Sequence, residues 1–477
     1  MYDLQAPPGV DTSHLTIAVV GGGSRSWART MMNDLGQQAE LHGTVRLYDI
    51  DHESAVQNAA FGRLVQSHPD AASDWEYVPV ESLAAALDGA DVVICSTQDS
   101  PAETMANDLD LPKAYGIVQT VGDTVGPGGT IRAMRAIPQY REIGLTIADQ
   151  CPDALVLNYT NPMTVCTATL YDAFPEINAV GLCHEVYHVK DRLAELAAEH
   201  LDLTAATGRS VRVNVKGINH FTFVDEATWN GIDLMPAVDA ELDARRPLPG
   251  GFDPGDLDDA SYFVDNDQVK LDYYRRYGVL GAAGDRHLAE FVPWYLAVED
   301  ERDVHRWGIR TTPSEYRVEK WPAGEDDRRA YLEGDREFEF SDSGEEMVQI
   351  MHAYFGGSPL QTNVNVPNAG QVAGLPKGAV VETNAAITPG SIDPIVAGGL
   401  PAQLESLVRR HVTNQETLVA AGREGDVDRA FQAFLDDPLV TIQPDEAAAL
   451  FADLIDVQRS YLEAWDLTDS DVMAEEA

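Results

Sequence analysis

The sequence predicts an α/β protein built on a doubly wound parallel sheet, and three observations indicate this fold. The N-terminal third alternates short apolar runs with helical stretches, which is typical of such a sheet. A glycine-rich turn directly follows the first apolar run. The chain of 477 residues also exceeds the usual size of one domain. We therefore expect a Rossmann-like domain over residues 1–200 and a larger α+β domain over residues 201–477.

The strands of the first domain are expected where short apolar runs alternate with helices. The predicted strands are residues 16–20, 45–48, 91–95, 117–121, 154–157 and 179–182.

The pattern changes in the second domain. An alternating strand is expected at residues 211–216, long polar loops follow, and residues 401–464 are expected to be mostly helical. The acidic stretch at residues 323–346 is expected to form a surface excursion, and we assign it no chemistry.

The charge balance excludes one class of partner. The chain has 33 basic and 78 acidic side chains and a net charge of −45. Such a surface repels the phosphates of nucleic acids, so nucleic acid is not expected as a partner. The acidic residues are spread along the whole chain and 44% of residues are hydrophobic, which favours a folded protein with a solvated acidic shell. We expect a halophilic source.

The sequence also indicates a compartment. No apolar run approaches the roughly 20 residues of a membrane helix, and the start has no secretion-signal pattern. The four cysteines lack the spacing of a zinc finger, which favours free thiols in a reducing compartment. The sequence therefore predicts a cytoplasmic protein. The cysteines are Cys95, Cys151, Cys166 and Cys183.

The glycine-rich turn is a candidate phosphate site. The predicted helix at 27–35 follows the turn, which reads Gly21-Gly22-Gly23-Ser24-Arg25-Ser26. Backbone N–H groups of such a turn, together with a helix N-terminus, can approach a pyrophosphate closely. Ser26 stands where the usual fingerprint has a third glycine, and an ordinary tight loop is an equal alternative for this motif alone.

Asp49 favours the dinucleotide interpretation. It follows the second predicted strand, where a carboxylate can accept hydrogen bonds from a ribose diol and repel the extra phosphate of NADP. The alternative is an ordinary helix cap before Asp51 and His52. The distance from the glycine turn favours binding, so NAD is the predicted cofactor.

Three further segments, at 121–129, 158–162 with 181–185, and 217–221, are rich in reactive side chains. Each lies at or just after a predicted strand end, where ligands of open α/β sheets collect. Cys183 and His220 offer a thiolate and an imidazole to a divalent ion. His184 and His188 are alternative ligands. A cysteine at such a position can also be an ordinary core residue, and a histidine can be a hydrogen-bonded loop or core residue.

These motifs together resemble a known family. The segments GGGS, GDTVGPGG, NYTNPM, GLCHE, GINHF and GAAGDRHLAEF are similar to glycoside hydrolase family 4, whose fold is related to lactate and malate dehydrogenases. The likeness extends from about residue 16 to the helical end FQAFLDDPLV. GDTVGPGG, CHEVY and AAGDRHLAEF most resemble the α-galacturonidase branch.

The resemblance implies roles for residues near a metal and a cofactor. Cys183 and His220 would hold a Mn-like divalent ion, and Asn161 would contact substrate hydroxyls beside it. Asp123 would lie near the leaving group. Asn158 opens the NYTNPM motif and is expected to contact NAD.

A tyrosine base is also implied by the resemblance. The matching stretch is residues 271–278, and Tyr277 is our prediction for the base. Tyr273, Tyr274 and Asp285 remain alternatives, and tyrosines at this spacing can simply pack a helix face.

The resemblance implies an unusual hydrolysis. Hydride transfer from sugar carbon 3 to NAD forms a ketone, which makes the proton on carbon 2 acidic. Elimination of the aglycone, addition of water and return of the hydride complete the cycle. The expected substrates are small α-galacturonides derived from pectin.

The carboxylate of a uronate substrate must be bound by positively charged side chains in this acidic protein. Arg286 and His287, helped by Arg132, are the predicted partners of its carboxylate, because a guanidinium binds a carboxylate bidentately. An ion pair between Arg286 and Glu290, one helical turn later, is the structural alternative.

Other functions remain open at this point. An α-galactosidase or α-glucuronidase of the same family would share the site, and a NAD-dependent hydroxy-acid dehydrogenase would share the fold. A nucleotide-binding sensor or scaffold without catalysis is the non-enzymatic alternative. The resemblance also implies a homo-oligomer, either a dimer or a tetramer.

Overall fold

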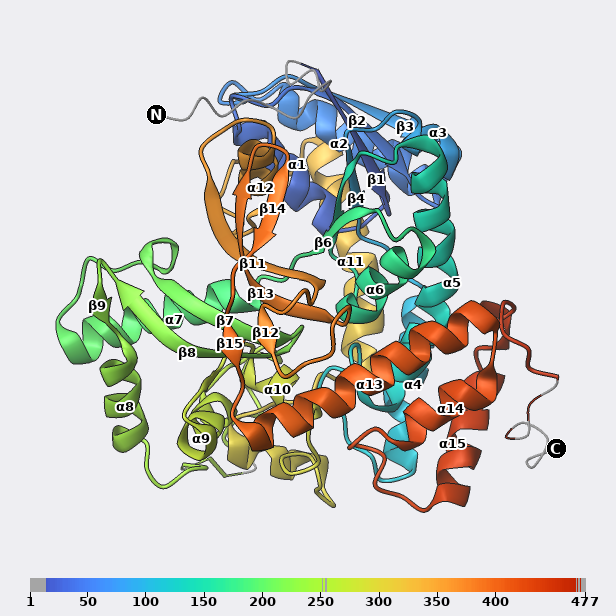
Figure 1. Cartoon of the computed structure of the whole chain (residues 1–477). Coiled ribbons are helices and arrows are strands. Elements are labelled where there is room, and N and C mark those ends of the chain that lie inside the picture. The colour runs from blue at the N-terminus through green and yellow to red at the C-terminus, as the bar shows by residue number, and fades with distance from the viewer. Residues whose placement is uncertain (1–13, 251, 254, 469, 471, 473–477) are drawn as a thin grey trace.

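The computed structural model describes residues 14–250, 252–253, 255–468, 470 and 472 (Figure 1). Its centre is one sheet of 13 strands. Six parallel strands occur in the order β3-β2-β1-β4-β5-β6, which is the strand order of a Rossmann fold. They are β1 (Leu15–Val20), β2 (Gly43–Tyr48), β3 (Trp75–Val80), β4 (Val92–Cys95), β5 (Leu155–Asn158) and β6 (Asn178–Gly181).

Two strand assignments differ from the sequence expectation. The strand β3 was not expected, although it pairs along its whole length with β2. The expected strand at 117–121 is wrong, because these residues form a loop between α4 (Ala102–Ala114) and α5 (Gly126–Gln150). The N–H groups of Thr120 and Val121 donate to the Glu290 side chain instead of to a neighbouring strand. A buried carboxylate thus replaces the sheet as the acceptor.

Helices cover both faces of the parallel strands, as a doubly wound sheet requires. Apolar side chains of α1, α2 and α12 pack with one face, and those of α3, α5 and α6 pack with the other. The helix α7 follows β6 and leads out of this layer. The bounds are α1 (Trp27–Gln37), α2 (His52–Gln66), α3 (Leu83–Leu87), α6 (Met163–Ala173), α7 (Glu185–Leu201) and α12 (Met347–Tyr354).

The same sheet continues into the C-terminal part of the chain. One residue pair, Asn365 with Gly181, joins β11 antiparallel to β6, and β13, β7, β8 and β10 follow in that order. The two predicted domains therefore share one sheet, and their division at residue 200 stays a prediction. The added strands are β7 (Arg212–Ile218), β8 (Phe221–Trp229), β9 (Ile232–Asp233), β10 (Leu280–Gly281), β11 (Leu360–Pro367), β13 (Val380–Thr388) and β14 (Ser391–Pro394), and a separate pair is β12 (Val372–Ala373) with β15 (Gly398–Gly399).

The C-terminal helices build the largest core. As expected for residues 401–464, the chain there is mostly helical, and these helices pack on α5 and α10. The expected strand at 211–216 is confirmed as β7. The helices of this part are α8 (Met235–Ala244), α9 (Gln268–Tyr277), α10 (Asp285–Glu290), α11 (Ser314–Glu333), α13 (Ala402–Glu424), α14 (Val427–Leu435) and α15 (Pro444–Asp456).

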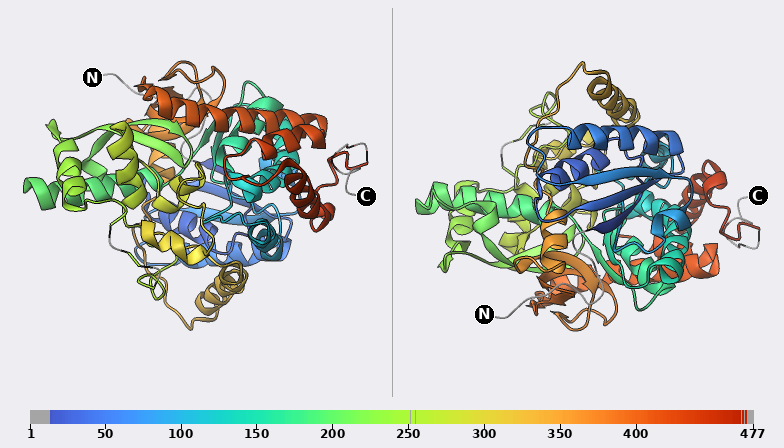
Figure 2. Two further views of the ribbon diagram at one scale, coloured as in Figure 1. Left: turned by 90° about the horizontal axis from the view of Figure 1, so that it is seen from below. Right: turned by 90° about the horizontal axis from the view of Figure 1, so that it is seen from above.

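The acidic stretch at 323–346 begins in the middle of helix α11. This helix packs against α2 and α4 beside the Rossmann strands, where Figure 2 shows it in gold. Within 323–346 only Arg328 is buried, so the expected surface location of this stretch is confirmed.

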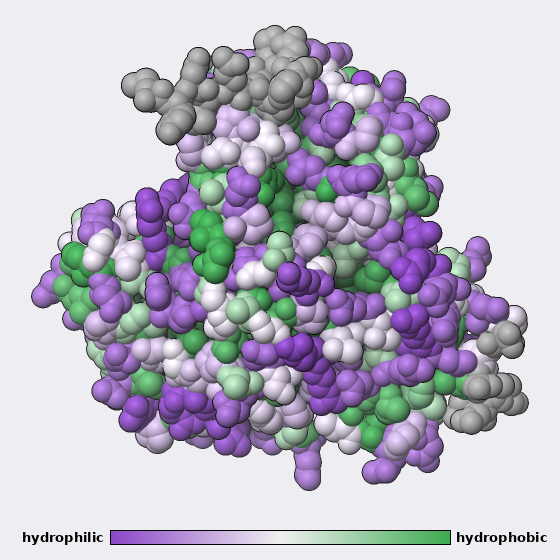
Figure 3. Space-filling model, viewed as in Figure 1, coloured by the Kyte–Doolittle hydropathy of each residue, from purple (hydrophilic) through white to green (hydrophobic). Residues whose placement is uncertain are grey.

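The surface reflects the acidic composition. The face drawn in Figure 3 is mostly hydrophilic, and much of its hydrophobic colour lies in recesses. Among the described helices, we find none that combines the length and hydropathy needed to span a membrane.

Candidate active site

The glycine turn after β1 packs tightly against the backbone of the neighbouring strand ends. Gly21 has a φ of +92°, and a Cβ there would lie 2.0 Å from the carbonyl oxygen of Ser96. The N–H groups of Gly21 and Gly22 both donate to the carbonyl of Tyr48, at 2.9 and 2.8 Å. Only glycine fits at Gly21, because any side chain would clash with the backbone of Ser96.

Asp49 is tied to this turn. Its Oδ2 accepts a hydrogen bond of 2.9 Å from the N–H of Gly23, and its Oδ1 accepts one of 2.9 Å from the N–H of Asp51. Each carboxylate oxygen retains a lone pair, so the group can still accept from a ribose. The Oγ of Ser24 accepts from the N–H of Trp27 at the start of α1. Arg25 pairs with Glu325 of α11 at 2.9 Å.

Both the amide oxygen and the amide nitrogen of the Asn158 side chain form hydrogen bonds inside the protein. Its Oδ1 accepts from the hydroxyl of Tyr140 and the N–H of Thr160, at 2.7 and 3.0 Å. Its Nδ2 lies within hydrogen-bond distance of Thr160 and Thr167. A direct contact of this side chain with a cofactor would require breaking one of these bonds, so the side chain supports the turn that carries Asn161.

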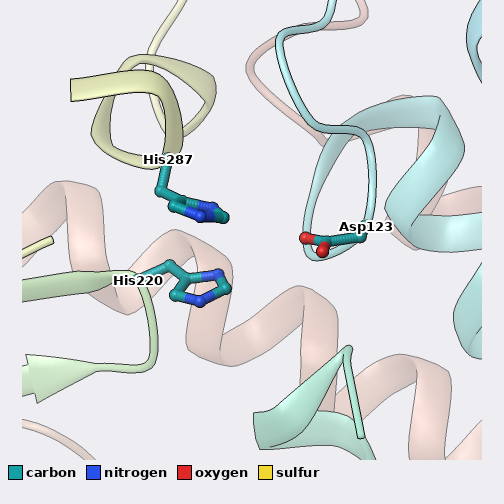
Figure 4. A group of neighbouring side chains, drawn as sticks. All are labelled: Asp123, His220 and His287. Carbon is teal, nitrogen blue, oxygen red and sulfur yellow. The ribbon is translucent and has the colours of Figure 1, made fainter. Parts of the chain in front are cut away.

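Three side chains from distant segments meet in one cluster (Figure 4). Asp123 lies in the loop before α5, His220 in the turn between β7 and β8, and His287 in α10. Their potential ligand atoms all lie within 4.8 Å of one another. We call this set the Asp123 cluster.

His220 is held in a strained and specific orientation. Its φ is +65°, a left-handed conformation that is uncommon outside glycine. Its Nδ1 lies 3.0 Å from the Oγ1 of Thr124, which donates to Asp123 at 2.7 Å. The ring stacks on His287 with 3.9 Å between centroids. Burial lowers the pKa of His220 to about 3, so the imidazole is neutral, as a metal ligand must be.

Asp123 is an anion in this cluster. Burial by itself raises the pKa of its carboxyl, but the neighbouring imidazole and guanidinium groups outweigh burial and hold the pKa well below its usual range. Asn161 donates from Nδ2 to Asp123 at 3.3 Å, and the carbonyl of Asn161 accepts from the Nε of Arg132 at 3.0 Å. The predicted residues Asp123, Asn161 and Arg132 are therefore brought together.

Cys183 lies just beyond β6, at the same edge of the sheet. Its Sγ does not fall within 4.8 Å of all three members of the Asp123 cluster. Burial raises the pKa of the thiol well above its usual value, and the carboxyl groups of Glu382 and Glu185 add to this effect. A bound divalent cation would lower the pKa of this thiol again, because it stabilises the thiolate.

The donors of this region fit a divalent cation. Two imidazoles and a carboxylate are common ligands of such ions. The Oδ1 of Asn161 is buried and, in the described part of the chain, has no hydrogen-bond partner. An unused buried acceptor beside these ligands is a place for a hydroxyl group or a cation.

Arg286 does not form the ion pair with Glu290 that was the structural alternative to its predicted role. The Oε1 of Glu290 accepts instead from the N–H groups of Thr120, Val121 and Gly122, at 2.7, 2.7 and 2.9 Å. Arg286 donates from Nη1 to the carbonyl of Tyr262 at 2.9 Å, and within the described residues its buried Nε has no partner. This guanidinium therefore keeps donors for a ligand.

Tyr277 lies at the C-terminal end of the tyrosine-rich helix α9, whose first residues pack on α10. The electrostatic neighbours of Tyr277 are Arg276 and Asp272, and its ring lies 6.0 Å from that of Tyr273. Burial raises the pKa of the Tyr277 hydroxyl. The role of Tyr277 as base stays a prediction.

The alternatives to Tyr277 have other contacts. Tyr274 donates to Asp239, and Tyr273 is fully buried among aromatic rings. The carboxylate of Asp285 accepts from the N–H groups of Gln268 and Lys270.

Two functional candidates escaped the sequence analysis. Glu185 lies 3.8 Å from the Nε2 of His287, and although burial opposes ionisation, His287, His220 and His184 lower its pKa to about 2. Its position directly after Cys183-His184 was an available signal. Arg317 of α11 donates to the carbonyl of Val121 at 2.6 Å, and no local motif indicates it. The alternative ligand His184 is half exposed and pairs with Glu345 at 3.3 Å.

Family models match most of the chain. The model for family 4 glycosyl hydrolase matches residues 16–199, and the model for the family 4 glycosyl hydrolase C-terminal domain matches residues 215–440. The chain belongs to glycoside hydrolase family 4. The expected resemblance is confirmed, and this family 4 member is a glycosidase.

The family 4 member is similar to α-galacturonidases of bacteria. It is 42% identical to that of Thermoanaerobacterium saccharolyticum over 457 residues, which cover 94% of this chain and 97% of the relative. It is 42% identical to that of Bacillus subtilis (strain 168) over 441 residues, with coverages of 92% and 97%. An α-galactosidase of Bacillus subtilis (strain 168) is 27% identical over 433 residues, with coverages of 88% and 92%.

Solved structures agree with the fold of this family 4 enzyme. The crystal structure of lplD from Bacillus subtilis has a TM-score of 0.86 and 42% identity, and the match covers 93% of this chain and 100% of that one. A 6-phospho-α-glucosidase from gut microorganisms, solved in complex with NAD and Mn2+, has a TM-score of 0.75 and 18% identity, with coverages of 94% and 99%. The expected α/β fold with a Rossmann-like sheet and an α+β C-terminal part is confirmed.

Proposed function

We propose that this family 4 glycosidase hydrolyses α-galacturonides of small oligouronides with NAD and a Mn-like divalent cation. The observation that carries the proposal is 42% identity to α-galacturonidases over more than nine tenths of the chain. The guanidinium groups of Arg132 and Arg286 beside the Asp123 cluster support a negatively charged substrate.

The residues for the two cofactors are those of the glycine turn and of the sheet edge. We propose that Gly21 to Arg25 and Asp49 hold NAD, because backbone N–H groups and a carboxylate suit its pyrophosphate and ribose. We propose Cys183 and His220 as ligands of the cation. When bound, NAD supplies a hydride acceptor and the cation supplies a Lewis acid.

Asn161, Arg286 and His287 are proposed to orient the sugar. The unused Oδ1 of Asn161 can accept a substrate hydroxyl. The free donors of Arg286, together with Arg132 and His287, can bind the uronate carboxylate. Orientation by several fixed donors positions one carbon of the ring for reaction.

Asp123 is proposed to assist departure of the aglycone. Its carboxylate stays ionised, so it acts by holding a water molecule whose proton passes to the leaving oxygen. Thr124 fixes one of its oxygens and Asn161 the other.

Tyr277 is the proposed base for the proton on carbon 2. Tyr277→Phe should abolish exchange of that proton with deuterium oxide, because the phenyl ring has no hydroxyl to accept it. NMR of the product sugar measures the exchange. Exchange at the normal rate in Tyr277→Phe would remove this residue from the reaction.

The decisive assay compares digalacturonate with a neutral α-galactoside under identical conditions. Each reaction contains NAD, Mn2+, a reductant and molar salt, and each component is omitted in turn. We expect cleavage of digalacturonate only when all are present, with no net NADH. Preference for the neutral α-galactoside, or for an α-glucuronide run in parallel, would assign another branch of the family.

The same assay separates the functions outside the family. A hydroxy-acid dehydrogenase would accumulate NADH in proportion to substrate. A nucleotide-binding sensor would be unaffected in its biological activity by His220→Ala, whereas the hydrolase should lose turnover.

Properties of the whole molecule complete the proposal. We propose that the acidic shell suits a halophilic source, that the enzyme is cytoplasmic and that it forms a dimer or tetramer. Measurement of its mass in solution at high salt decides the last point.

A further inference from the structure

Arg317 lies one turn into α11 and faces the loop that carries Asp123. Its Nη2 donates to the carbonyl of Val121, two residues before Asp123, at 2.6 Å. Its Nη1 lies 3.5 Å from the Sδ of Met105. Its buried Nε has no hydrogen-bond partner among the described residues. Most of its five N–H donors are therefore not used by strong acceptors.

Arg317 also lacks the usual neutralising partner. In the part of the chain that the structure describes, no carboxylate oxygen lies within 4.0 Å of its nitrogens, although acidic residues outnumber basic ones by 78 to 33. By contrast, the buried Arg135 pairs with two carboxylates, Asp99 at 2.5 Å and Asp108 at 2.7 Å. A desolvated guanidinium without an anion is costly to fold, which indicates an anionic ligand.

Other cationic side chains converge on the same place. Arg132 and Arg317 contact the same Met105 sulfur, at 3.7 and 3.5 Å. The carboxylates of Asp123 and Glu290 attract the Arg317 guanidinium from beyond ion-pair distance, and Arg132 and Arg286 repel it. Three guanidinium groups, those of Arg132, Arg286 and Arg317, thus lie near the loop that carries Asp123.

We propose that Arg317 binds the carboxylate of the uronate and makes the enzyme selective for uronides over neutral glycosides. This inference rests on the proposed galacturonidase function. Arg132 is less free for the role, because its Nε donates to Asn161 and lies 3.8 Å from Asp99. Arg286 stacks its guanidinium 4.9 Å from the Phe263 ring. The two contacts of Arg317 are with a carbonyl and a thioether, and neither of these groups carries a charge.

The test compares aryl α-galacturonide and aryl α-galactoside hydrolysis by wild type, Arg317→Gln and Arg317→Lys. Arg317→Gln should raise KM for the galacturonide about 10- to 100-fold, the loss expected for a hydrogen bond between charged groups. KM for the galactoside should change less than about threefold, and Arg317→Lys should be intermediate because it keeps the charge without the fork. Arg329→Gln is the matched control, since Arg329 lies in the exposed part of α11 and pairs with Asp326.

Calorimetry adds a binding measurement without turnover. The holoenzyme with NAD but without Mn2+ is titrated with galacturonate and with galactose, and only the affinity for galacturonate should fall in Arg317→Gln. Equal losses for both sugars, or weaker binding of NAD, would overturn the inference. If Arg317→Gln does not fold, as judged by circular dichroism, Arg317→Lys decides by the same criteria.

The two proposals fail differently. If wild type binds and cleaves the galacturonide but Arg317→Gln and Arg317→Lys do so equally well, the inference alone is overturned. If wild type neither binds galacturonate nor cleaves the galacturonide, both proposals are overturned.

Discussion

Thr124 connects the two charged parts of the candidate site at the scale of single residues. Its hydroxyl donates to Asp123 and contacts the Nδ1 of His220, so it sets the position of a carboxylate and of an imidazole at once. The stacked His287 holds the other side of the His220 ring. Groups that orient a metal ligand in this way tune metal affinity without touching the metal.

Thr124→Val should therefore weaken Mn2+ binding about 10- to 100-fold, the range found for such orienting groups. Valine keeps the shape and removes only the hydroxyl. Titration calorimetry of the NAD-bound protein with Mn2+ measures the effect. Thr413→Val, at an exposed position of α13, is the control. Unchanged affinity in Thr124→Val would mean that His220 is oriented by packing alone.

At the scale of elements, Arg135 ties α5 to its neighbours. Its guanidinium donates to Asp99 in the loop after β4, to Asp108 of α4 and to Gln458 beyond α15. All these groups are buried, so the network is shielded from solvent. The loop that carries Asp123 joins α4 to α5, and Arg135 ties these two helices together.

Arg135→Met should lower the free energy of unfolding by about 3–5 kcal/mol, because it leaves buried carboxylates without a partner. Urea unfolding in molar salt measures this. Arg141→Met removes a partly exposed pair with Asp172 on the same helix and should cost no more than about 1 kcal/mol. Similar losses in both variants would contradict the role of burial.

The carboxyl group of Asp34 in α1 contacts the segment after α11 and can titrate. Asp34 accepts hydrogen bonds from Ser343 and Asn33, at 2.6 and 2.7 Å. Burial raises the pKa of its carboxyl to about 6 from an ordinary value of 3.8. The folded state thus binds more protons than the unfolded state between these pH values, and this group makes stability fall as pH rises from about 4 to about 6.

Asp34→Asn should remove that part of the pH dependence. The stability of the variant relative to wild type should therefore increase as pH rises from 4 to 7, as melting temperatures at each pH would measure. Asp70→Asn, at a side chain with 83% exposure, is the control. A constant difference between Asp34→Asn and wild type over this range would show that the carboxyl does not titrate there.

At the scale of the whole molecule, net charge is the dominant property. A charge of −45 on one chain produces repulsion between surface carboxylates, which opposes the compact state. The screening length falls from about 10 Å at 0.1 M salt to about 3 Å at 1 M. Salt should therefore stabilise this molecule.

We expect the melting temperature to rise steadily between 0.1 and 2 M KCl, as circular dichroism would measure. Sucrose at matched osmolality is the control, because it strengthens burial without screening charge. Full stability at 0.1 M KCl, with no gain at higher salt, would contradict the halophilic proposal.

The sequence by itself was sufficient to predict the features that depend on neighbouring residues in the chain. The glycine turn with Asp49 and five of the six parallel strands follow from backbone conformation and hydrophobic pattern, whereas β3 was missed. The motifs around Cys183 and His220 were enough to predict the family. The loop at 117–121 was misjudged because an apolar run resembles a strand when its partner, Glu290, is distant in the chain.

Only the tertiary structure stacked His287 on His220 and brought Glu290 and Arg317 against the loop that carries Asp123. These contacts join segments more than 60 residues apart, and no local pattern specifies them. The physical reason is that the directions of such side chains depend on how the helices pack on the shared sheet. Packing therefore decides which charges remain free to meet a ligand.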